Sequence, residues 1–394
     1  MPFGRTLRPL WGLADDVVFL NHGSYGACPR EVLAAQDAIR ARMEAQPDLF
    51  FGNEISPGEG PTTLRAAARE IARFIGAEGE NIAFVENATA GIQAVLSSLP
   101  FAPGDQILIT DHTYNAMRLM VEARCAETGA VPLTVSFALP ATSHDIAARI
   151  EAALTPRVKF AIIDHITSPS ALVLPLPRTI AALRRNGTRV LIDGAHGIGQ
   201  VPLDLTALAP DWYVTNLHKW LFAPKGCAVL YASKEAAPLT RPAVVSHFIG
   251  FGFPQAFDYT GTRDNTAWLA APAALAFFQK LGEDALRAYQ AHLIDACTAL
   301  FAPLGITPIA ERNMCAAMRT FLLPQRRAAK NDDAETLTRA LWDQERIQAR
   351  PLVLGDKLMM RVSAQAYVDE DDLKRLTGAL ARLGWPARAT TFAP

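Results

Sequence analysis

A carboxylate and a lysine stand at the ends of two successive apolar runs, and together they indicate a particular kind of chemistry. Asp193 ends the run that starts at Val190, and Lys219 comes 26 residues later, after the run that starts at Asp211. A lysine amine in a partly desolvated pocket can hold an aldehyde as an imine, and a carboxylate can keep a pyridine nitrogen protonated. This pair of residues therefore predicts a site for pyridoxal 5'-phosphate.

Each of the two residues also has a plain structural interpretation. Most lysines are surface residues at turns, and an aspartate that follows a strand can cap the next helix. Ligands of open α/β sheets bind beyond the carboxyl ends of the strands, and both Asp193 and Lys219 follow such runs, which favours the cofactor interpretation for the pair. We expect the nearby His196 to contact the cofactor ring or its phenolic oxygen, with turn capping as the alternative.

A phosphate group requires fixed hydrogen-bond donors, ideally where a turn of small residues opens a helix. The segment Asn87-Ala-Thr-Ala-Gly91 lies between a predicted strand and a predicted helix. Ala88 and Thr89 would offer backbone N–H groups and a hydroxyl there. His218 and the loop Gly261-Thr262 are candidates for further donors.

An aromatic ring and an arginine complete the set of residues suited to this chemistry. Asp111-His-Thr-Tyr114 ends another predicted strand, where a ring could stack on the cofactor; His112 is the first candidate and Tyr114 the second. Arg361 lies among the apolar residues of Met359-Met-Arg-Val-Ser363, where a cation is costly unless it meets an anion. From the residues alone, Arg361 has two possible roles: it could bind an amino-acid carboxylate, or it could form a structural salt bridge.

The composition is that of an ordinary globular enzyme. Apolar residues make up 50% of the chain and charged residues 20%, and the net charge of −1 with scattered basic residues argues against nucleic-acid or membrane partners. The five cysteines form no CxxC pair, so neither a disulfide framework nor a metal site is predicted. We find no secretory leader and no apolar run of about 18 residues, and we expect a cytoplasmic protein.

Between about residues 60 and 280, helical patterns alternate with short apolar runs. Apolar runs without strict alternation are typical of strands covered on both faces, so we predict a three-layer α/β/α domain with a mostly parallel sheet. The last two strands are joined too tightly for a helical crossover, which predicts an antiparallel step between them. The predicted strands are 81–86, 106–110, 159–164, 189–193, 211–217 and 226–231, and the predicted helices 61–76, 89–99, 115–129 and 178–187.

The pattern changes after residue 281 and predicts a smaller C-terminal α/β domain over 282–394. The large cofactor-binding domain is expected to span 26–281, and segment 1–25 to associate with the small domain and the active-site entrance. The Pro/Gly-rich stretch 248–262 is interpreted as a long functional loop. In the small domain we predict helices at 283–302 and 334–345 and from residue 369, and strands at 318–323, 347–354 and 357–363.

These motifs resemble the class V aminotransferase family of pyridoxal phosphate enzymes, which has fold type I, and the resemblance covers nearly the whole chain. The family pattern stands here as Asp193-Gly-Ala-His196, His218-Lys219 and Pro224-Lys-Gly226. Within the family the chain is similar to the isopenicillin N epimerase-like group. That similarity rests on Phe19-Leu-Asn-His-Gly-Ser-Tyr-Gly-Ala27, Thr260-Gly-Thr-Arg-Asp264 and Arg361-Val-Ser363.

The resemblance implies a homodimer with shared active sites and a role for each of several residues. Lys219 would bind the cofactor and act as the catalytic base, Asp193 would pair with the pyridine nitrogen, and His112 would stack on the ring. Ala88, Thr89 and His218 would hold the phosphate, Thr262 would reach in from the partner subunit, and Arg361 would bind the substrate carboxylate. We expect Asn21, His22, Tyr25, Arg263 and the 248–262 loop to shape the substrate pocket, with turn capping and interface packing as alternatives.

The expected reaction begins with removal of the Cα proton of an amino-acid substrate. Epimerisation is the first hypothesis, with C–S lyase or aminotransferase chemistry as the alternative and a non-catalytic dimeric binding protein as a remote one. Epimerisation requires a second acid–base group, for which Tyr25, Tyr114 and Tyr259 are candidates. No cysteine stands between residues 347 and 360, and Cys315 lies 46 residues before Arg361, so a desulfurase that forms a persulfide is not expected.

Overall fold

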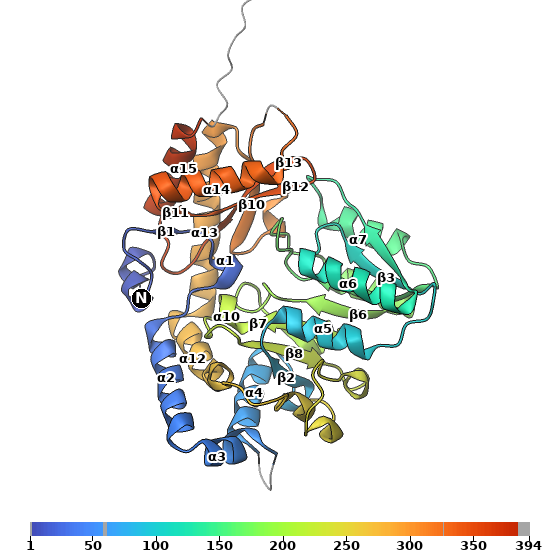
Figure 1. The fold of residues 1–394 in the computed structure, drawn as a ribbon. Coiled ribbons are helices and arrows are strands. Elements are labelled where there is room, and N and C mark those ends of the chain that lie inside the picture. The colour runs from blue at the N-terminus through green and yellow to red at the C-terminus, as the bar shows by residue number, and fades with distance from the viewer. Residues whose placement is uncertain (1, 58–60, 326, 385–394) are drawn as a thin grey trace, which may run out of the picture.

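A mixed sheet of seven strands forms the centre of the computed structural model, which describes residues 2–57, 61–325 and 327–384 (Figure 1). β3 to β7 pair in parallel, whereas β8 is antiparallel to both of its neighbours. The predicted mostly parallel sheet and the antiparallel step that follows Lys219 are therefore confirmed. The spatial order is β2 (Ile82–Val85), β8 (Ala228–Ala232), β7 (Trp212–Asn216), β6 (Arg189–Asp193), β5 (Val158–Asp164), β3 (Gln106–Thr110) and β4 (Val131–Val135).

Helices cover both faces of this sheet, as the apolar strands predict. Successive strand residues point to opposite faces, so that Leu191 and Ile192 belong to two separate buried clusters. One cluster includes α5 (Ala88–Ser98) and α6 (Asn115–Thr128). The other includes α4 (Thr63–Phe74), α7 (Ser143–Ala152), α8 (Leu176–Arg185) and α12 (Ala271–Leu281). The three-layer α/β/α architecture of fold type I is confirmed.

The C-terminal part of the chain builds a second sheet in the order β12-β13-β10-β9. Its strands are β9 (Thr307–Pro308), β10 (Met318–Leu322), β12 (Arg350–Leu354) and β13 (Lys357–Ser363), and its helices are α13 (Glu283–Phe301), α14 (Asn331–Glu345) and α15 (Glu370–Arg382). The predicted strand 347–354 is in fact two strands. β11 (Ile347–Gln348) pairs in parallel with β1 (Val18–Phe19), and β12 pairs with β13.

The pairing of β1 with β11 brings the N-terminal segment beside the C-terminal sheet (Figure 1). Segment 1–25 contains η1 (Arg5–Leu10) and α1 (His22–Tyr25). The next helices are α2 (Arg30–Ala45), α3 (Pro47–Phe50) and η2 (Phe51–Ile55), and they pack toward α12 and α4 instead. The domain limits at residues 25 and 281 stay a prediction. Residues 385–394 of the predicted C-terminal domain lie outside the described residues.

Several elements were not predicted, and local sequence explains why. β4 is an edge strand with mostly exposed residues and a proline at position 132, so it lacks the apolar run by which the inner strands were recognised. The 248–262 stretch contains the single turns η5 (Ile249–Phe251) and η6 (Gln255–Phe257). Within the described ranges, no helix has the length and apolar character needed to cross a membrane, and no cluster of residues suited to hold a metal ion is present.

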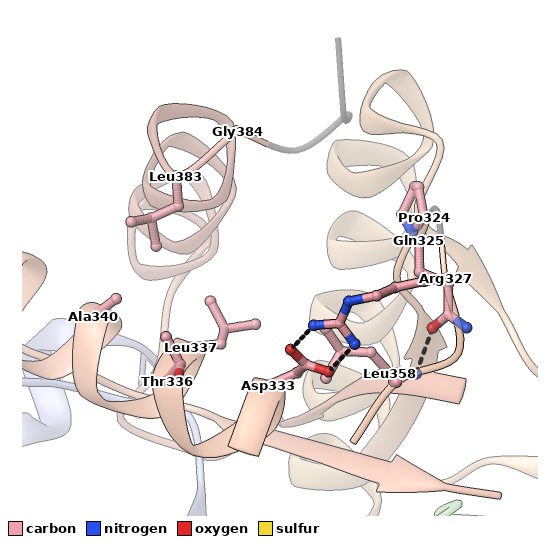
Figure 2. A pocket seen from close by; sticks show the side chains of 11 residues that line it. Pro324, Gln325, Arg327, Asp333, Thr336, Leu337, Ala340, Leu358, Leu383 and Gly384 are labelled. Atoms are coloured by element: carbon pink, nitrogen blue, oxygen red, sulfur yellow. Dashed lines mark hydrogen bonds and ion pairs between the residues drawn. The ribbon is translucent and has the colours of Figure 1, made fainter. Parts of the chain in front are cut away.

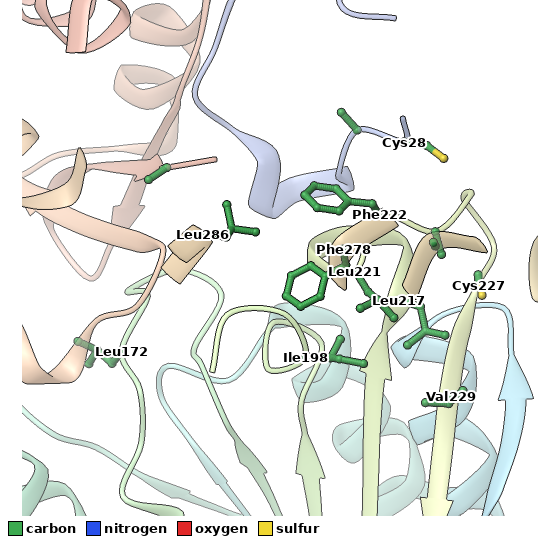
Figure 3. Packing of buried hydrophobic residues seen from close by; sticks show 14 of the residues in the cluster. Cys28, Leu172, Ile198, Leu217, Leu221, Phe222, Cys227, Val229, Phe278 and Leu286 are labelled. Atoms are coloured by element: carbon green, nitrogen blue, oxygen red, sulfur yellow. The ribbon is translucent and has the colours of Figure 1, made fainter. Parts of the chain in front are cut away.

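The segment that carries Lys219 rests on buried apolar residues of the core. Lys219 lies in the single turn α10 (Leu217–Trp220), directly after β7, and Leu217, Leu221 and Phe222 are fully buried. Figure 3 shows these three side chains gathered above Ile198 and beside Phe278. The Phe222 ring packs at 6.2 Å from that of Phe278. Burial of these flanking residues fixes the backbone of the lysine.

The substitution Phe278→Ala should destabilise the fold strongly, because it removes a fully buried ring from this cluster. We expect the free energy of unfolding to fall by about 3–5 kcal/mol, the usual cost of a Phe-to-Ala cavity. Denaturant unfolding monitored by circular dichroism measures it. Phe251→Ala, at a ring that is 56% exposed, should change stability by less than about 0.5 kcal/mol.

Candidate active site

A cavity of about 330 Å³ lies where the carboxyl ends of β5, β6 and β7 meet the N-terminal segment and the C-terminal sheet. This volume is at the lower end of the range for small-molecule sites. Polar groups converge on it from three parts of the chain. The charged residues on its wall are Asp164, Asp193, Lys219, Arg350 and Arg361.

Lys219 is half-buried on the wall of this cavity, and the loss of solvation changes its chemistry. The loss of solvation is the largest cause that lowers the pKa of its amine to about 8, and the charge of Arg361 lowers it further, against the opposing effect of Asp193. Because the pKa is near neutrality, a substantial share of the amine is uncharged at physiological pH. An uncharged lysine is a nucleophile and a base.

His196 and Trp220 hold the amine of Lys219 in a defined hydrogen-bonding environment. The indole N–H of Trp220 donates to Nδ1 of His196 at 3.2 Å, so this ring nitrogen is an acceptor. Burial places the pKa of His196 well below its usual range, and the neutral ring must then carry its hydrogen on Nε2. Nε2 lies 3.3 Å from Nζ of Lys219. The histidine therefore donates to an uncharged lysine amine.

His22 is buried behind the cavity rather than on its wall. Its Nε2–H donates to the backbone carbonyl of Lys219 at 2.9 Å, which leaves Nδ1 to accept from the Tyr367 hydroxyl at 2.7 Å. The pKa of His22 is lowered to about 3, chiefly because the ring is buried. The structure thus places this residue where it anchors the lysine backbone, not where a substrate would touch it.

Two carboxyl groups lie side by side at the ends of β5 and β6. Asp164 pairs in register with Asp193, and both are buried. Burial raises the pKa of Asp164 well above its usual range, and the charge of Asp193 raises it further. Burial raises the pKa of Asp193 as well, but the Ala195 N–H, which donates to it at 3.0 Å, and the charge of Lys219 both oppose this rise. We assign the proton of the pair to Asp164 and the charge to Asp193.

The N-terminus of α5 borders the same cavity and offers anion-binding groups. The Ala88 N–H already donates to the side chain of Asn216 at 2.8 Å, and the Ala90 N–H to that of Asn87 at 2.9 Å. The N–H and hydroxyl of Thr89 have no hydrogen-bond partner within the described part of the chain. Of the residues predicted to bind a phosphate here, Thr89 has its donors available, whereas Ala88 uses its N–H internally.

His218 lies on the cavity wall beside Lys219. Its Nδ1–H donates to the carbonyl of Cys227 at 2.9 Å. Burial is the main cause that lowers its pKa to about 4, so its other ring nitrogen carries a lone pair at neutral pH. His218 is predicted to donate to the cofactor phosphate. To do so, its second ring nitrogen would have to become protonated when the phosphate binds.

The structure distinguishes between the two predicted stacking rings. His112 packs flat against Phe137, with ring centroids 4.1 Å apart, and its Nδ1 lies 2.7 Å from the hydroxyl of Ser170. It does not line the cavity, whereas Tyr114 does. Phe137 covers one face of the His112 ring, and stacking of the other face on the cofactor stays a prediction, with Tyr114 as the alternative that lines the cavity.

Arg361 is a buried cation that has no acidic partner among the residues the structure describes. It donates to the carbonyl of Ser168 at 2.6 Å, to Oδ1 of Asn21 at 3.1 Å and to the hydroxyl of Ser24 at 3.0 Å. No carboxylate of the described residues forms an ion pair with it, and burial lowers its pKa to about 10. The structural salt bridge considered from the sequence is therefore absent among the described residues. The guanidinium of Arg361 is available to bind an anion in the cavity.

The remaining predicted residues divide between the mouth of the cavity and its surroundings. Asn21 and Tyr25 line the cavity. Thr262 is exposed and shares a hydrogen bond with the hydroxyl of Tyr259, and Arg263 pairs with Glu86 and lies 4.2 Å from the Trp268 ring. Neither Thr262, Arg263 nor Tyr259 lines the cavity of its own chain.

A second hollow of about 440 Å³ lies in the C-terminal part of the chain between α14 and the end of α15 (Figure 2). Its charged groups, Arg327 and Asp333, form an ion pair with each other at 2.6 Å. The rest of its wall is largely apolar. Because its charges are already paired and it contains no lysine, it offers no comparable chemistry.

Comparison with known proteins gives a consistent result. The class V aminotransferase family matches residues 56–376. An isopenicillin N epimerase of Streptomyces clavuligerus is 31% identical over 94% of this chain and 96% of its own, and a putative L-cysteine desulfhydrase of Oryza sativa subsp. japonica is 30% identical over 93% and 83%. A complex of the cystine C–S lyase C-DES with cysteine persulfide has a similar fold, with a TM-score of 0.75 and 24% identity over 94% of this chain and 98% of its own.

A further solved structure bears on the cofactor. A mutant of C-DES carries glycine covalently linked to its pyridoxal phosphate cofactor and superimposes with a TM-score of 0.77 at 24% identity, over 95% of this chain and 98% of its own. The cavity has the groups that pyridoxal phosphate requires. It combines a lysine whose pKa is lowered to about 8, a buried carboxylate whose second oxygen is free of hydrogen bonds within the described residues, and open donors at a helix N-terminus.

Covalent attachment of pyridoxal phosphate to the apoprotein should follow the ionisation of Lys219. Because only the uncharged amine reacts, the attachment rate should rise about tenfold per pH unit below pH 8 and level off above about pH 8. Borohydride reduction followed by mass spectrometry measures the attached fraction. Lys219→Ala should show no attachment, and a rate that kept rising toward pH 10.5 would contradict a lowered lysine pKa.

Trp220→Phe should raise the pH midpoint of this attachment, by up to about one unit for the loss of one hydrogen bond. Without the indole N–H, Nδ1 of His196 can hold the hydrogen, and Nε2 then accepts from the protonated form of Lys219. Trp212→Phe is the matched control, because it removes an indole N–H that donates to Thr240 instead. An equal shift in both variants would point to a general packing effect.

Proposed function

We propose that this chain, which belongs to the class V aminotransferase family and uses pyridoxal phosphate as its cofactor, is a lyase that cleaves the Cβ–S bond of an amino acid. The observation that supports it best is the arrangement of the charged groups around the cavity. Arg361 is a buried cation without an acidic partner in the described chain, and Lys219 is a half-buried base with a pKa of about 8. One binds the carboxylate that every α-amino acid carries, and the other removes a proton beside it.

Each residue has a defined task in this proposal. Arg361 orients the substrate carboxylate, Nζ of Lys219 takes the Cα proton, and His196 keeps the lysine amine uncharged until then. Asp193 holds a proton on the ring nitrogen, and the open donors of Thr89 bind the phosphate. When bound, pyridoxal phosphate supplies a ring that accepts the electron pair left at Cα. Expulsion of a thiolate from Cβ then uses that electron pair.

Elimination requires fewer proton-transfer groups than epimerisation, and this difference is our reason for proposing elimination first. Return of a proton to the opposite face of Cα requires a second acid–base group. Of the three tyrosines considered from the sequence, Tyr259 does not line the cavity, and Tyr25 and Tyr114 do so with 76% and 47% of their surface exposed. Side chains this exposed lack the packing that holds a catalytic acid in a fixed position.

Epimerisation remains the second candidate. It is favoured by the 31% and 32% identity to curated proteins named isopenicillin N epimerase, and Tyr114 is the residue we would assign as the second acid. Aminotransferase chemistry would use the same two residues, Lys219 and Arg361, and differs in where the proton returns. A thiol that forms a persulfide is not part of any of these proposals, since Cys315 packs against Arg312 and does not line the cavity.

We further infer that the active protein is a homodimer in which Thr262 and Arg263 serve the partner's cavity. Both residues lie in the Gly261-Thr-Arg loop, away from the cavity of their own chain. Thr262 is exposed, and when the Tyr259 hydroxyl donates to its oxygen, its own hydroxyl hydrogen can be donated to a phosphate from outside. Analytical ultracentrifugation and mixing of Thr262→Val with Lys219→Ala subunits would detect complementation between subunits.

The reaction is tested with L-cysteine and S-substituted cysteines in deuterated water. We expect release of thiol and pyruvate without accumulation of the D-isomer, and Arg361→Gln should lower kcat/KM at least about 30-fold, for the loss of a buried charge pair worth 2 kcal/mol or more. Arg339→Gln, at an exposed arginine of α14, is the control for the change in charge. Deuterium at Cα with racemisation and no thiol release would favour the epimerase instead.

A further inference from the structure

Arg350 is a second arginine on the wall of the same cavity, and it has no assigned role. It opens β12, directly opposite Arg361 of β13 in the antiparallel register. Side chains that stand opposite each other in an antiparallel pair project from the same face of the sheet, about 5 Å apart at Cβ. Both arginines line the cavity, Arg361 at its buried end and Arg350 with an exposed side chain.

Two like charges in this position are unfavourable unless an anion lies between or beside them. The charge of Arg350 acts on Arg361: burial is the main cause that lowers the pKa of Arg361, and the nearby charge of Arg350 lowers it further. Within the described chain, neither arginine forms an ion pair, and Arg350 makes no side-chain hydrogen bond. Other exposed arginines of this protein do form ion pairs, for example Arg346 with Asp16 and Arg382 with Glu345.

The acids of the cavity do not serve Arg350. Asp164 and Asp193 are the acidic residues on the described wall, and both lie at the ends of strands of the large sheet. Asp193 interacts with Lys219, and Asp164 accepts from the hydroxyl of Thr113 at 3.3 Å. The cavity therefore presents one cation at depth and a second nearer its mouth, with no negative charge to match the second.

We propose that Arg350 binds a second anionic group, carried at the end of the substrate side chain, so that the preferred substrate is an amino acid with two carboxylates. This deepens the proposed function and rests on it, because it assumes that Arg361 holds the α-carboxylate. The thioether carbon chain would span the cavity between the two arginines. A small neutral amino acid such as cysteine would fill only the Arg361 end.

The test compares two ligands of nearly the same shape, S-carboxymethyl-L-cysteine and S-carbamoylmethyl-L-cysteine, on the holoenzyme. Their dissociation constants are measured from the change in the visible absorbance of the cofactor, and their kcat/KM values from thiol release. We expect the carboxylate to bind at least about tenfold more tightly than the amide, as one charge-assisted hydrogen bond provides. This preference should shrink as salt is added, because Arg350 is exposed.

Arg350→Gln should abolish the preference while leaving the affinity for the amide ligand nearly unchanged. Arg339→Gln, at another exposed arginine of the C-terminal part, should leave the preference intact. Equal binding of the two ligands, or a preference that survives Arg350→Gln, would overturn the inference about Arg350. The proposed function would still stand in that case, because both ligands would change the cofactor absorbance and release thiol. If neither ligand changes the absorbance or releases thiol, the proposed function and the inference fail together.

Discussion

The burial of one lysine amine is the constraint on which this structure depends. A buried ammonium is costly, and the fold responds by lowering the pKa of the amine to about 8 rather than by forming a close ion pair with an acid. Lys219 is held at both ends, since His22 binds its backbone carbonyl and His196 binds its amine. Each histidine is in turn fixed by an aromatic donor, the hydroxyl of Tyr367 or the indole of Trp220. The reactive state of the lysine is thus a property of its packing.

The central sheet and the chemical pair within it could be predicted because local sequence determines them. An inner strand of a parallel sheet must be apolar throughout, so a polar residue at its end is conspicuous. Asp193 and Lys219 both stand out in this way, and Arg361 does so within its own apolar strand. Edge elements such as β4 have no such requirement, and their exposed, proline-containing sequence gave no signal.

The rest of the site depends on register and on contacts between distant segments. Arg350 faces Arg361 only because β12 and β13 pair in one register, and Asp164 lies beside Asp193 for the same reason in β5 and β6. His112 and Tyr114 are two residues apart, and only the position of Phe137 decides that the first turns into the core. The sequence predicts His22 as a pocket residue. It does not reveal that His22 is buried against Tyr367, because that partner is more than 300 positions away.

The pairing of β1 with β11 has a consequence for how the protein is made. β1 is immediately followed by Asn21, His22 and Ser24, whose partners are Lys219, Arg361 and Tyr367. On the ribosome, the strands around Asp193 and Lys219 emerge long before residues 347–367, so the large sheet can form while the N-terminal segment still waits for its partner strand. The group of Arg361 with Asn21 and Ser24, which we propose binds the substrate carboxylate, is therefore completed last, when nearly the whole chain has been synthesised.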